Sequence, residues 1–410
     1  MKLLLFAHTP PPYHGQSIAV KLMLERFGGD RRKSEFRRLP PNRYGVECYH
    51  VDARFSKSLE DVGELQAGKT VLLLLFCLQA IWCRFRYGVE NLFYIPAPGK
   101  PVALYRDWLV MLVCRPFFKR LIFNWRAAGL AKWLETTAGK RMRRITFERM
   151  KYADASIVLS EFSRDDAEKL MARRVMVVAG GVADPCPEFD FEILPRRRAR
   201  VLERKGIFSR APVRNETDKT VNVVFIGHCT REKGVFDSIA GIALANDRLA
   251  AEGLPLRFKL TLIGAFTSVA EENEIRELIR TPELRGAVII LGFTSNERKI
   301  QELSDADLFC FPSYYLAEGQ PASLIEAMAF GLPVVTTRWR AIPDMFDENY
   351  PGIVDCKSPG QIAVKLRELC VSDLSGPLRE AYLRRFTIER HLEAMAEAIR
   401  SVENTDSNHT

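Results

Sequence analysis

The stretch EGQPASLIEAMAFGLP, residues 318–333, carries signals for both ends of a single helix. Pro321 suits the first helical position, Gly331 suits the left-handed residue that ends a helix, and Pro333 cannot continue it. An apolar run that ends at Phe311 comes shortly before, which predicts a buried strand there. The free amides of the helix start should therefore lie at the carboxyl end of that strand, where they can hold a phosphate group.

Two carboxylates and a hydroxyl in this stretch are candidate contacts for a sugar nucleotide. Glu326 lies on an otherwise apolar helix, where a carboxylate needs hydrogen-bond partners, and sugar hydroxyls would serve. Glu318 precedes the helix on the phosphate side, where it can contact a sugar attached to that phosphate, and Ser323 can add a hydroxyl. The alternatives are a solvated loop acid for Glu318 and a half-exposed helix acid for Glu326.

Short apolar runs rich in Val, Ile, Leu and Phe recur between helical patterns, which is typical of buried parallel strands. The fold class is therefore α/β, and two series of strands predict two Rossmann-like domains that face each other across a ligand-binding cleft. We predict strands in the first half at residues 2–7, 47–53, 121–124, 155–159 and 175–178. In the second half we predict strands at residues 221–226, 259–263, 287–291, 307–311 and 333–336.

The two strand series place the domains at residues 1–195 and 220–383. The stretch 196–219 between them is polar and basic, and we interpret it as a linker or surface loop. Its cations are Arg196, Arg197, Arg198, Arg200, Arg204 and Lys205. The tail, residues 384–403, has apolar residues at helical spacing, which predicts a helix that packs back on the N-terminal domain.

The composition is that of a soluble globular protein, with 47% hydrophobic and 27% charged residues in 410. The 60 Lys and Arg against 51 Asp and Glu give a formal charge of +9, which favours anionic partners. Nucleic acid is the least favoured of these, since no recognition motif accompanies the charge. Nine scattered cysteines without a Cys-x-x-Cys pair argue against a disulfide framework or a zinc ribbon and indicate a reducing cytosol.

Apolar segments in the first half bear on localisation. The run at residues 3–7 is too short for a signal peptide, and none reaches the roughly 20 apolar residues of a membrane-spanning helix. We expect residues 71–82 to form a core or interfacial helix. Residues 108–120 join apolar bulk to basic residues, which fits either a face resting on an anionic bilayer or a core helix with a solvated basic side. The expected location is the cytoplasm, peripheral at the inner face of the membrane in the first case.

Two further motifs follow predicted strands. Residues 225–234 form a strand and a turn that carries Arg231 and Lys233, which can neutralise a diphosphate or simply be solvated. Residues 8–17 form a strand-to-helix turn in which Gly15 allows close approach of the backbone to a ligand.

Together these segments resemble the family-4 retaining glycosyltransferases of GT-B architecture. Glu318 and Glu326 match the family's Glu-x7-Glu motif, and Lys233-Gly234 match its phosphate-binding lysine and glycine. The resemblance implies transfer of a sugar, most simply a hexose, from a nucleotide diphosphate sugar to a lipid-linked or surface-polysaccharide acceptor with retained anomeric configuration.

The resemblance also implies roles for individual residues. The catalytic group is Glu318, Lys233 and Arg231. The donor-binding group is Gly227, Gly292, Gly319, Gln320, Ser323 and Glu326. The acceptor-side loop resembles that of polysaccharide-building members and comprises His14, Gly15, Gln16 and Ser17.

The chemistry expected from this resemblance is stabilisation of the leaving diphosphate by cations and helix amides, without a cofactor or a divalent metal. Two positions depart from the family pattern: His228 stands where an arginine is usual, and residues 123–126 lack the histidine that many members carry. An alternative function is therefore a catalytically silent protein that binds a nucleotide sugar or a polyanion.

Two other short motifs match known phosphate-binding and metal-binding patterns, but neither has the structural context that its pattern requires. Residues 63–70 match the Walker A pattern, but no buried strand precedes them, as a phosphate loop requires. Asp305 and Asp307 have the Asp-x-Asp spelling of a metal site, but they open a strand, and we interpret them as structural.

Overall fold

The computed structural model describes residues 1–11, 15–54, 67–210 and 218–403 of the chain. These residues form two compact units. The first comprises Met1–Gly180 together with the chain from Glu389 onward, and the second comprises Gly181–Ile388. The α/β class is confirmed, because each unit is built on a six-stranded sheet in which all paired strands are parallel.

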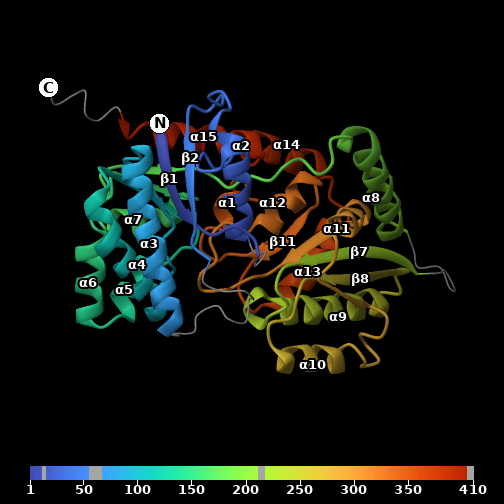
Figure 1. The fold of residues 1–410 in the computed structure, drawn as a ribbon. Coiled ribbons are helices and arrows are strands. Elements are labelled where there is room, and N and C mark those ends of the chain that lie inside the picture. Colours follow the sequence, from blue (N-terminus) through green and yellow to red (C-terminus); the bar gives the residue numbers. More distant parts are fainter. Residues whose placement is uncertain (12–14, 55–66, 211–217, 404–410) are drawn as a thin grey trace. The chain divides into compact units, whose positions relative to one another are not determined.

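The first unit has the strand order β2-β1-β3-β4-β5-β6. Its strands are apolar, and all except the edge strand β6 are largely buried, because helices connect each strand to the next (Figure 1). The strands are β1 Lys2–Ala7, β2 Glu47–Asp52, β3 Asn91–Tyr94, β4 Arg120–Trp125, β5 Ala155–Val158 and β6 Val175–Val177. The helices are α1 Gly15–Arg26, α2 Ser34–Arg37, α3 Ala67–Tyr87, α4 Pro101–Cys114, α5 Leu130–Thr136, α6 Lys140–Met150, α7 Arg164–Glu168 and α15 Ile388–Arg400, whose first residue is the last of the second unit.

The second unit has the strand order β12-β11-β10-β7-β8-β9. The strands are β7 Lys219–Ile226, β8 Leu256–Ile263, β9 Val288–Gly292, β10 Leu308–Phe311, β11 Val334–Thr337 and β12 Ile353–Val354. The helices are α8 Leu194–Phe208, α9 Val235–Ala251, α10 Val269–Leu278, α11 Asn296–Asp305, α12 Ala322–Ala329, α13 Pro359–Leu369 and α14 Ser375–Arg385. The ten strands predicted from the sequence are all present, and β3 and β12 are additional.

The interpretation of residues 196–219 as a linker is wrong for its first part, which forms α8. Its arginines alternate with apolar residues at helical spacing, and three of them turn inward. Arg197 is buried and donates to the carbonyl oxygens of Phe330 and Ala306. Arg200 and Arg204 form ion pairs with Asp307 at 2.6 and 3.0 Å. The basic residues thus hold a helix on the sheet; residues 211–217 lie outside the described residues.

Asp307 is structural, as the sequence indicated. Its side chain is fully buried between the two arginines of α8, and it also accepts a hydrogen bond from the backbone amide of Asn222 at 2.9 Å. The carboxylate joins α8, β7 and the start of β10. Asp305 ends α11 and accepts a hydrogen bond from Gln301.

The unit boundaries differ from the predicted ones because α14 and the chain just after it pair with residues 182–184. The amide of Val182 donates to the carbonyl of Phe386, and the amide of Ile388 donates to the carbonyl of Val182, both at 3.0 Å. Asp184 forms an ion pair with Arg379 at 2.6 Å. Residues 181–195 therefore belong to the second unit, and the first unit resumes only at Glu389.

Residues 108–120, which we considered as a membrane-facing segment, are largely a core helix and its C-terminal turn. Val110, Met111 and Cys114 are buried, and the indole Nε1 of Trp108 donates to the hydroxyl of Thr146 at 3.0 Å. The helix α4 thus packs between α3 and α6 in the first unit (Figure 1).

The same segment, residues 108–120, exposes Leu112 and Phe117, and a longer row of exposed apolar side chains lies on α3. Within the described residues, Gly68–Tyr87 is the one helix long and apolar enough, by length and composition, to cross a membrane. One side of the helix packs into the core through Leu73, Cys77, Ala80 and Cys83. The other side exposes large apolar side chains, between 39 and 70% of each: Val71, Leu74, Leu75, Leu78, Trp82 and Phe85.

Candidate active site

Tight loops follow the carboxyl ends of β7 and β8 in the second unit. Gly264 has φ +145°, and a side chain there would collide with the carbonyl of Gly227. Gly234 is left-handed, with φ +82°, and a side chain there would collide with the carbonyl of Pro312 after β10. These two close approaches require glycine and draw the loops after β7, β8 and β10 together.

Lys233 and Glu318 meet at this edge of the sheet. Lys233 lies in a 3-10 turn, Arg231–Lys233, and its Nζ is 2.7 Å from Oε2 of Glu318. The same oxygen accepts a hydrogen bond from the hydroxyl of Ser313 at 2.6 Å, and Glu318 is only 6% exposed. The ammonium of Lys233 also stands 4.6 Å from the ring centre of Tyr315. Two residues 85 positions apart, both predicted for the site, thus form one partly buried ion pair.

Glu326 has a cation as its partner. The helix α12 buries Leu324, Ile325, Ala327 and Met328, whereas Glu326 is partly buried and its Oε1 is 2.6 Å from Nζ of Lys299 on α11. The lysine supplies the hydrogen bond that a carboxylate on an apolar helix needs.

Arg231 points to a different partner from Lys233. Its exposed guanidinium is 2.7 Å from both carboxylate oxygens of Glu274 on α10 and stacks 3.8 Å from the ring centre of Phe236. A contact with a diphosphate would require this surface pair to open, which costs little because exposed pairs contribute about 0.2 to 1 kcal/mol.

His228, in the position where the family usually has an arginine, is neutral. Burial, and then the nearby charge of Lys233, lower the pKa of the His228 imidazole. Its Nδ1 is enclosed and has no hydrogen-bond partner among the described residues. His228 therefore offers a ligand a polar nitrogen without a charge.

The remaining donor-side predictions lie around this ion pair. Gly292 ends β9 with φ +68° and open space beside it. Gly319 and Gln320 lie in the loop between Glu318 and α12, and Ser323 is in the first turn of that helix and partly buried.

The acceptor-side predictions divide into two groups. His14 lies outside the described residues. Gly15, Gln16 and Ser17 form the first turn of α1, where Ser17 is buried. Of these three residues, Gly15 and Gln16 present surface.

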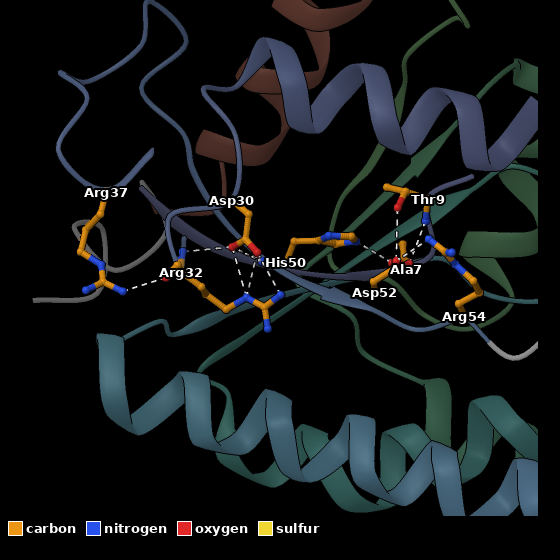
Figure 2. Close-up of polar contacts among 8 residues, drawn as sticks. All are labelled: Ala7, Thr9, Asp30, Arg32, Arg37, His50, Asp52 and Arg54. Carbon is orange, nitrogen blue, oxygen red and sulfur yellow. Dashed lines mark hydrogen bonds and ion pairs between the residues drawn. The ribbon is translucent and has the colours of Figure 1, made fainter. Parts of the chain in front are cut away.

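A carboxylate that the sequence analysis did not consider lies at the start of the loop after β1. Asp52 ends β2 and accepts hydrogen bonds from the backbone amide of Thr9 at 3.0 Å and from Arg54 at 2.8 Å (Figure 2). The Arg54 guanidinium also donates to the carbonyl of Pro10, so both residues hold the start of the loop after β1. Figure 2 also shows His50, whose ring Nε2 lies 2.8 Å from the carbonyl oxygen of Ala7. The sequence signal that could have identified Asp52 is a carboxylate at the carboxyl end of a buried strand.

The second unit matches a known family. The model for glycosyl transferases group 1 matches residues 208–385. WcaL of Escherichia coli, named as a colanic acid biosynthesis glycosyltransferase, is 28% identical over 199 residues, 46% of each chain. The amylovoran biosynthesis glycosyltransferase AmsK of Erwinia amylovora is 28% identical over 144 residues, 34% of this chain and 33% of AmsK. The matched part spans less than half of either relative.

Solved structures match nearly the whole chain at low identity. Sucrose-phosphate synthase of Thermosynechococcus elongatus has a TM-score of 0.67 and 16% identity, over 98% of this chain and all of that one. HepE of Anabaena, solved with UDP and glucose, has a TM-score of 0.59 and 16% identity, over 98% and 100% of the two chains. The chain therefore has the GT-B fold, and its residues 208–385 match the family model for glycosyl transferases group 1.

Proposed function

We propose that the chain is a retaining glycosyltransferase that moves a sugar from a nucleotide diphosphate sugar to a polysaccharide precursor. The observation that carries the proposal is the ion pair between Lys233 and Glu318 beside the start of α12. It joins the two residues to which the resemblance to family-4 enzymes assigns a phosphate contact and a sugar contact. The retained configuration rests on the resemblance to family-4 enzymes.

The geometry supports stabilisation of the leaving diphosphate as the main contribution to the rate enhancement. Charge accumulates on the diphosphate as the glycosidic bond breaks, and a fixed cation at Lys233 stabilises that charge more than the ground state. Glu318 and Tyr315 hold the Lys233 ammonium in place before substrate binds. The first amides of α12 add positive potential on the same side. In this proposal the reaction needs no cofactor and no divalent metal.

The proposed acceptor is lipid-linked or part of a surface polysaccharide. WcaL and AmsK are named for the biosynthesis of such polymers, which supports this class of acceptor. The exposed apolar side of α3 supports peripheral attachment at the inner face of a membrane, where a lipid-linked acceptor is found. Helix α6, which packs on α4, carries the exposed cations Lys140, Arg141, Arg143 and Arg144, which suit anionic lipid.

The rival function is a nucleotide-sugar-binding protein without catalysis. The engagement of Arg231 by Glu274 favours it, as does the lack of a histidine at the end of β4. Release of free nucleotide from UDP-sugars in the presence of lipid-linked acceptors separates the two functions, because a silent protein would bind and release nothing.

The central test is Lys233→Ala in the full chain. We expect nucleotide binding to weaken by about 1.5 to 3 kcal/mol, the scale of a hydrogen bond to a charged group, measured by calorimetric titration with UDP. Lys69→Ala, in the segment with the Walker A spelling, is the matched control and should bind as the parent does. The proposal fails if Lys69 rather than Lys233 controls nucleotide binding.

A further inference from the structure

A cation without a compensating anion lies at the carboxyl edge of the first sheet. Arg126 follows directly after β4, and its Nε is enclosed without a hydrogen-bond partner among the described residues. Burial lowers the pKa of Arg126 to about 10, with no carboxylate acting against it. The fully buried arginines have several partners: Arg204 and Arg379 pair with carboxylates, and Arg31 and Arg197 each donate to two or more backbone carbonyls. Leaving a guanidinium desolvated and unpaired is unfavourable for the fold, which makes a functional reason for Arg126 worth seeking.

His391 holds the guanidinium of Arg126 without neutralising it. The Nδ1 of His391 lies 2.6 Å from the carbonyl oxygen of Ala179, so Nδ1 carries the proton and donates it. Nε2 is then free to accept the hydrogen bond from Arg126, at 3.4 Å. Burial and the charge of Arg126 lower the pKa of His391 to about 3, so the imidazole is neutral at physiological pH. His391 is thus a positioning residue for the cation.

A second unsatisfied group lies two residues before Arg126. Asn124 is 1% exposed, and its side-chain oxygen has no hydrogen-bond partner among the described residues. Asn124 is the penultimate residue of β4, and Arg126 is the first residue after that strand. A buried acceptor atom and a buried donor atom without partners, two residues apart at one strand end, match a ligand that offers a hydroxyl and an oxyanion.

We propose that Arg126 binds an oxyanion of the sugar acceptor, a carboxylate or a phosphate, while Asn124 accepts a hydrogen bond from one of its hydroxyls. The inference rests on the proposed function and deepens it, because it makes the acceptor an anionic saccharide. We assign the oxyanion to the acceptor because the family-matched residues for the donor nucleotide all lie in the second unit.

The test uses small probes on the purified full chain. Methyl glucuronide and glucose 1-phosphate carry the two oxyanions, and methyl glucoside is the neutral control. We expect one or both anionic probes at millimolar concentration to raise the thermal midpoint of the parent, with no effect of the glucoside. Arg126→Gln should abolish the shift, while Arg141→Gln, an exposed arginine of the same unit, should keep it. An equal response of parent and Arg126→Gln, or an equal response to the neutral glucoside, overturns the proposal.

Stability without ligand gives an independent readout. If Arg126 is retained for binding, Arg126→Gln removes an uncompensated charge and should raise the urea midpoint of the free protein. A structural arginine would instead lower it. A lower midpoint in Arg126→Gln, together with unchanged probe binding, overturns the proposal.

Two further arms separate this proposal from the donor site. Lys233→Ala should lose its response to UDP and keep its response to the anionic acceptor probe, so that failure of the nucleotide site is seen separately. UDP-glucuronate is compared with UDP-glucose on the parent and on Arg126→Gln. A preference for UDP-glucuronate that disappears in Arg126→Gln would place the oxyanion on the donor and overturn the assignment to the acceptor.

Discussion

Glu318 is the residue on which the sugar-contact hypothesis depends most. Its carboxylate is nearly buried and shared by Lys233 and Ser313. We expect Glu318→Gln to fold, because the amide keeps the shape and can still accept the hydrogen bond from Ser313. Turnover should fall at least tenfold, about 1.4 kcal/mol in the barrier, since the carboxylate no longer contacts the sugar or fixes Lys233. Glu302→Gln on α11 is the control, and steady-state nucleotide release is the measurement; unchanged turnover in a folded Glu318→Gln variant would remove Glu318 from the site.

His391 should make the free energy of unfolding decrease as the pH falls below 6.5. The pKa of His391 is about 3 in the fold against 6.5 for the ordinary imidazole, so above pH 6.5 both states are neutral and the residue adds no pH dependence. Below pH 6.5 the unfolded chain takes up a proton that the folded chain refuses. The free energy of unfolding therefore falls by up to about 1.4 kcal/mol per pH unit until pH 3.

The test of this dependence is His391→Gln, whose side chain does not titrate. Urea unfolding at pH 6.5 and pH 5 should show a loss of stability that is smaller in the variant by up to about 2 kcal/mol. Equal losses in variant and parent would show that His391 takes up its proton in the folded state as well.

Residue types at strand ends were predictable, whereas their partners were not. The family resemblance predicted one site for Lys233 and Glu318, and each of them follows an apolar strand that was predicted from the sequence. The sequence did not indicate that Glu274 engages Arg231 or that Lys299 engages Glu326, because these partners come from the neighbouring helices α10 and α11. Pairings of this kind depend on how helices pack, which a single sequence does not reveal.

At the scale of elements, long apolar strands were predictable and short or charged elements were not. β3 has four residues, begins with Asn91, and was missed because it lacks an apolar run of strand length. The basic residues of α8 predict an exposed loop, because charged side chains are usually exposed to solvent, yet Arg197 and Arg204 are buried in this helix. Guanidinium groups can be buried where backbone carbonyls and a carboxylate such as Asp307 accept their hydrogen bonds.

The exposed side of α3 should bind membranes. Burying one exposed leucine or phenylalanine contributes about 1.5 to 3 kcal/mol, so Leu78→Ser and Phe85→Ser should each weaken binding to liposomes about tenfold or more. Sedimentation with anionic liposomes is the measurement, and added salt should weaken binding of the parent further. Leu202→Ser on α8, an equally exposed leucine, is the control. Absence of parent binding at low salt would rule out this surface as a membrane contact.

At the scale of the whole molecule, sugar transfer should proceed without a divalent metal. In the proposed mechanism Lys233 and the start of α12 stabilise the diphosphate, and Asp307 of the Asp-x-Asp motif already pairs with Arg200 and Arg204. Turnover should therefore be the same with and without excess EDTA. Activity lost in EDTA and restored by magnesium or manganese would overturn this account of the leaving group.

The chain leaves its first unit at Gly180 and returns to it only at Glu389, which sets an order for its folding during synthesis. The returning segment is an integral part of that unit: Leu392, Met395 and Ile399 are buried, and Arg174 donates to the carbonyl of Ser401 at 2.6 Å. On the ribosome, the second unit is therefore complete before the first, although its residues are made later. More than 200 residues are translated between the first part of this unit and α15. During that interval the first sheet lacks α15, and the apolar surface that α15 later covers is the part of the nascent chain that most needs a chaperone.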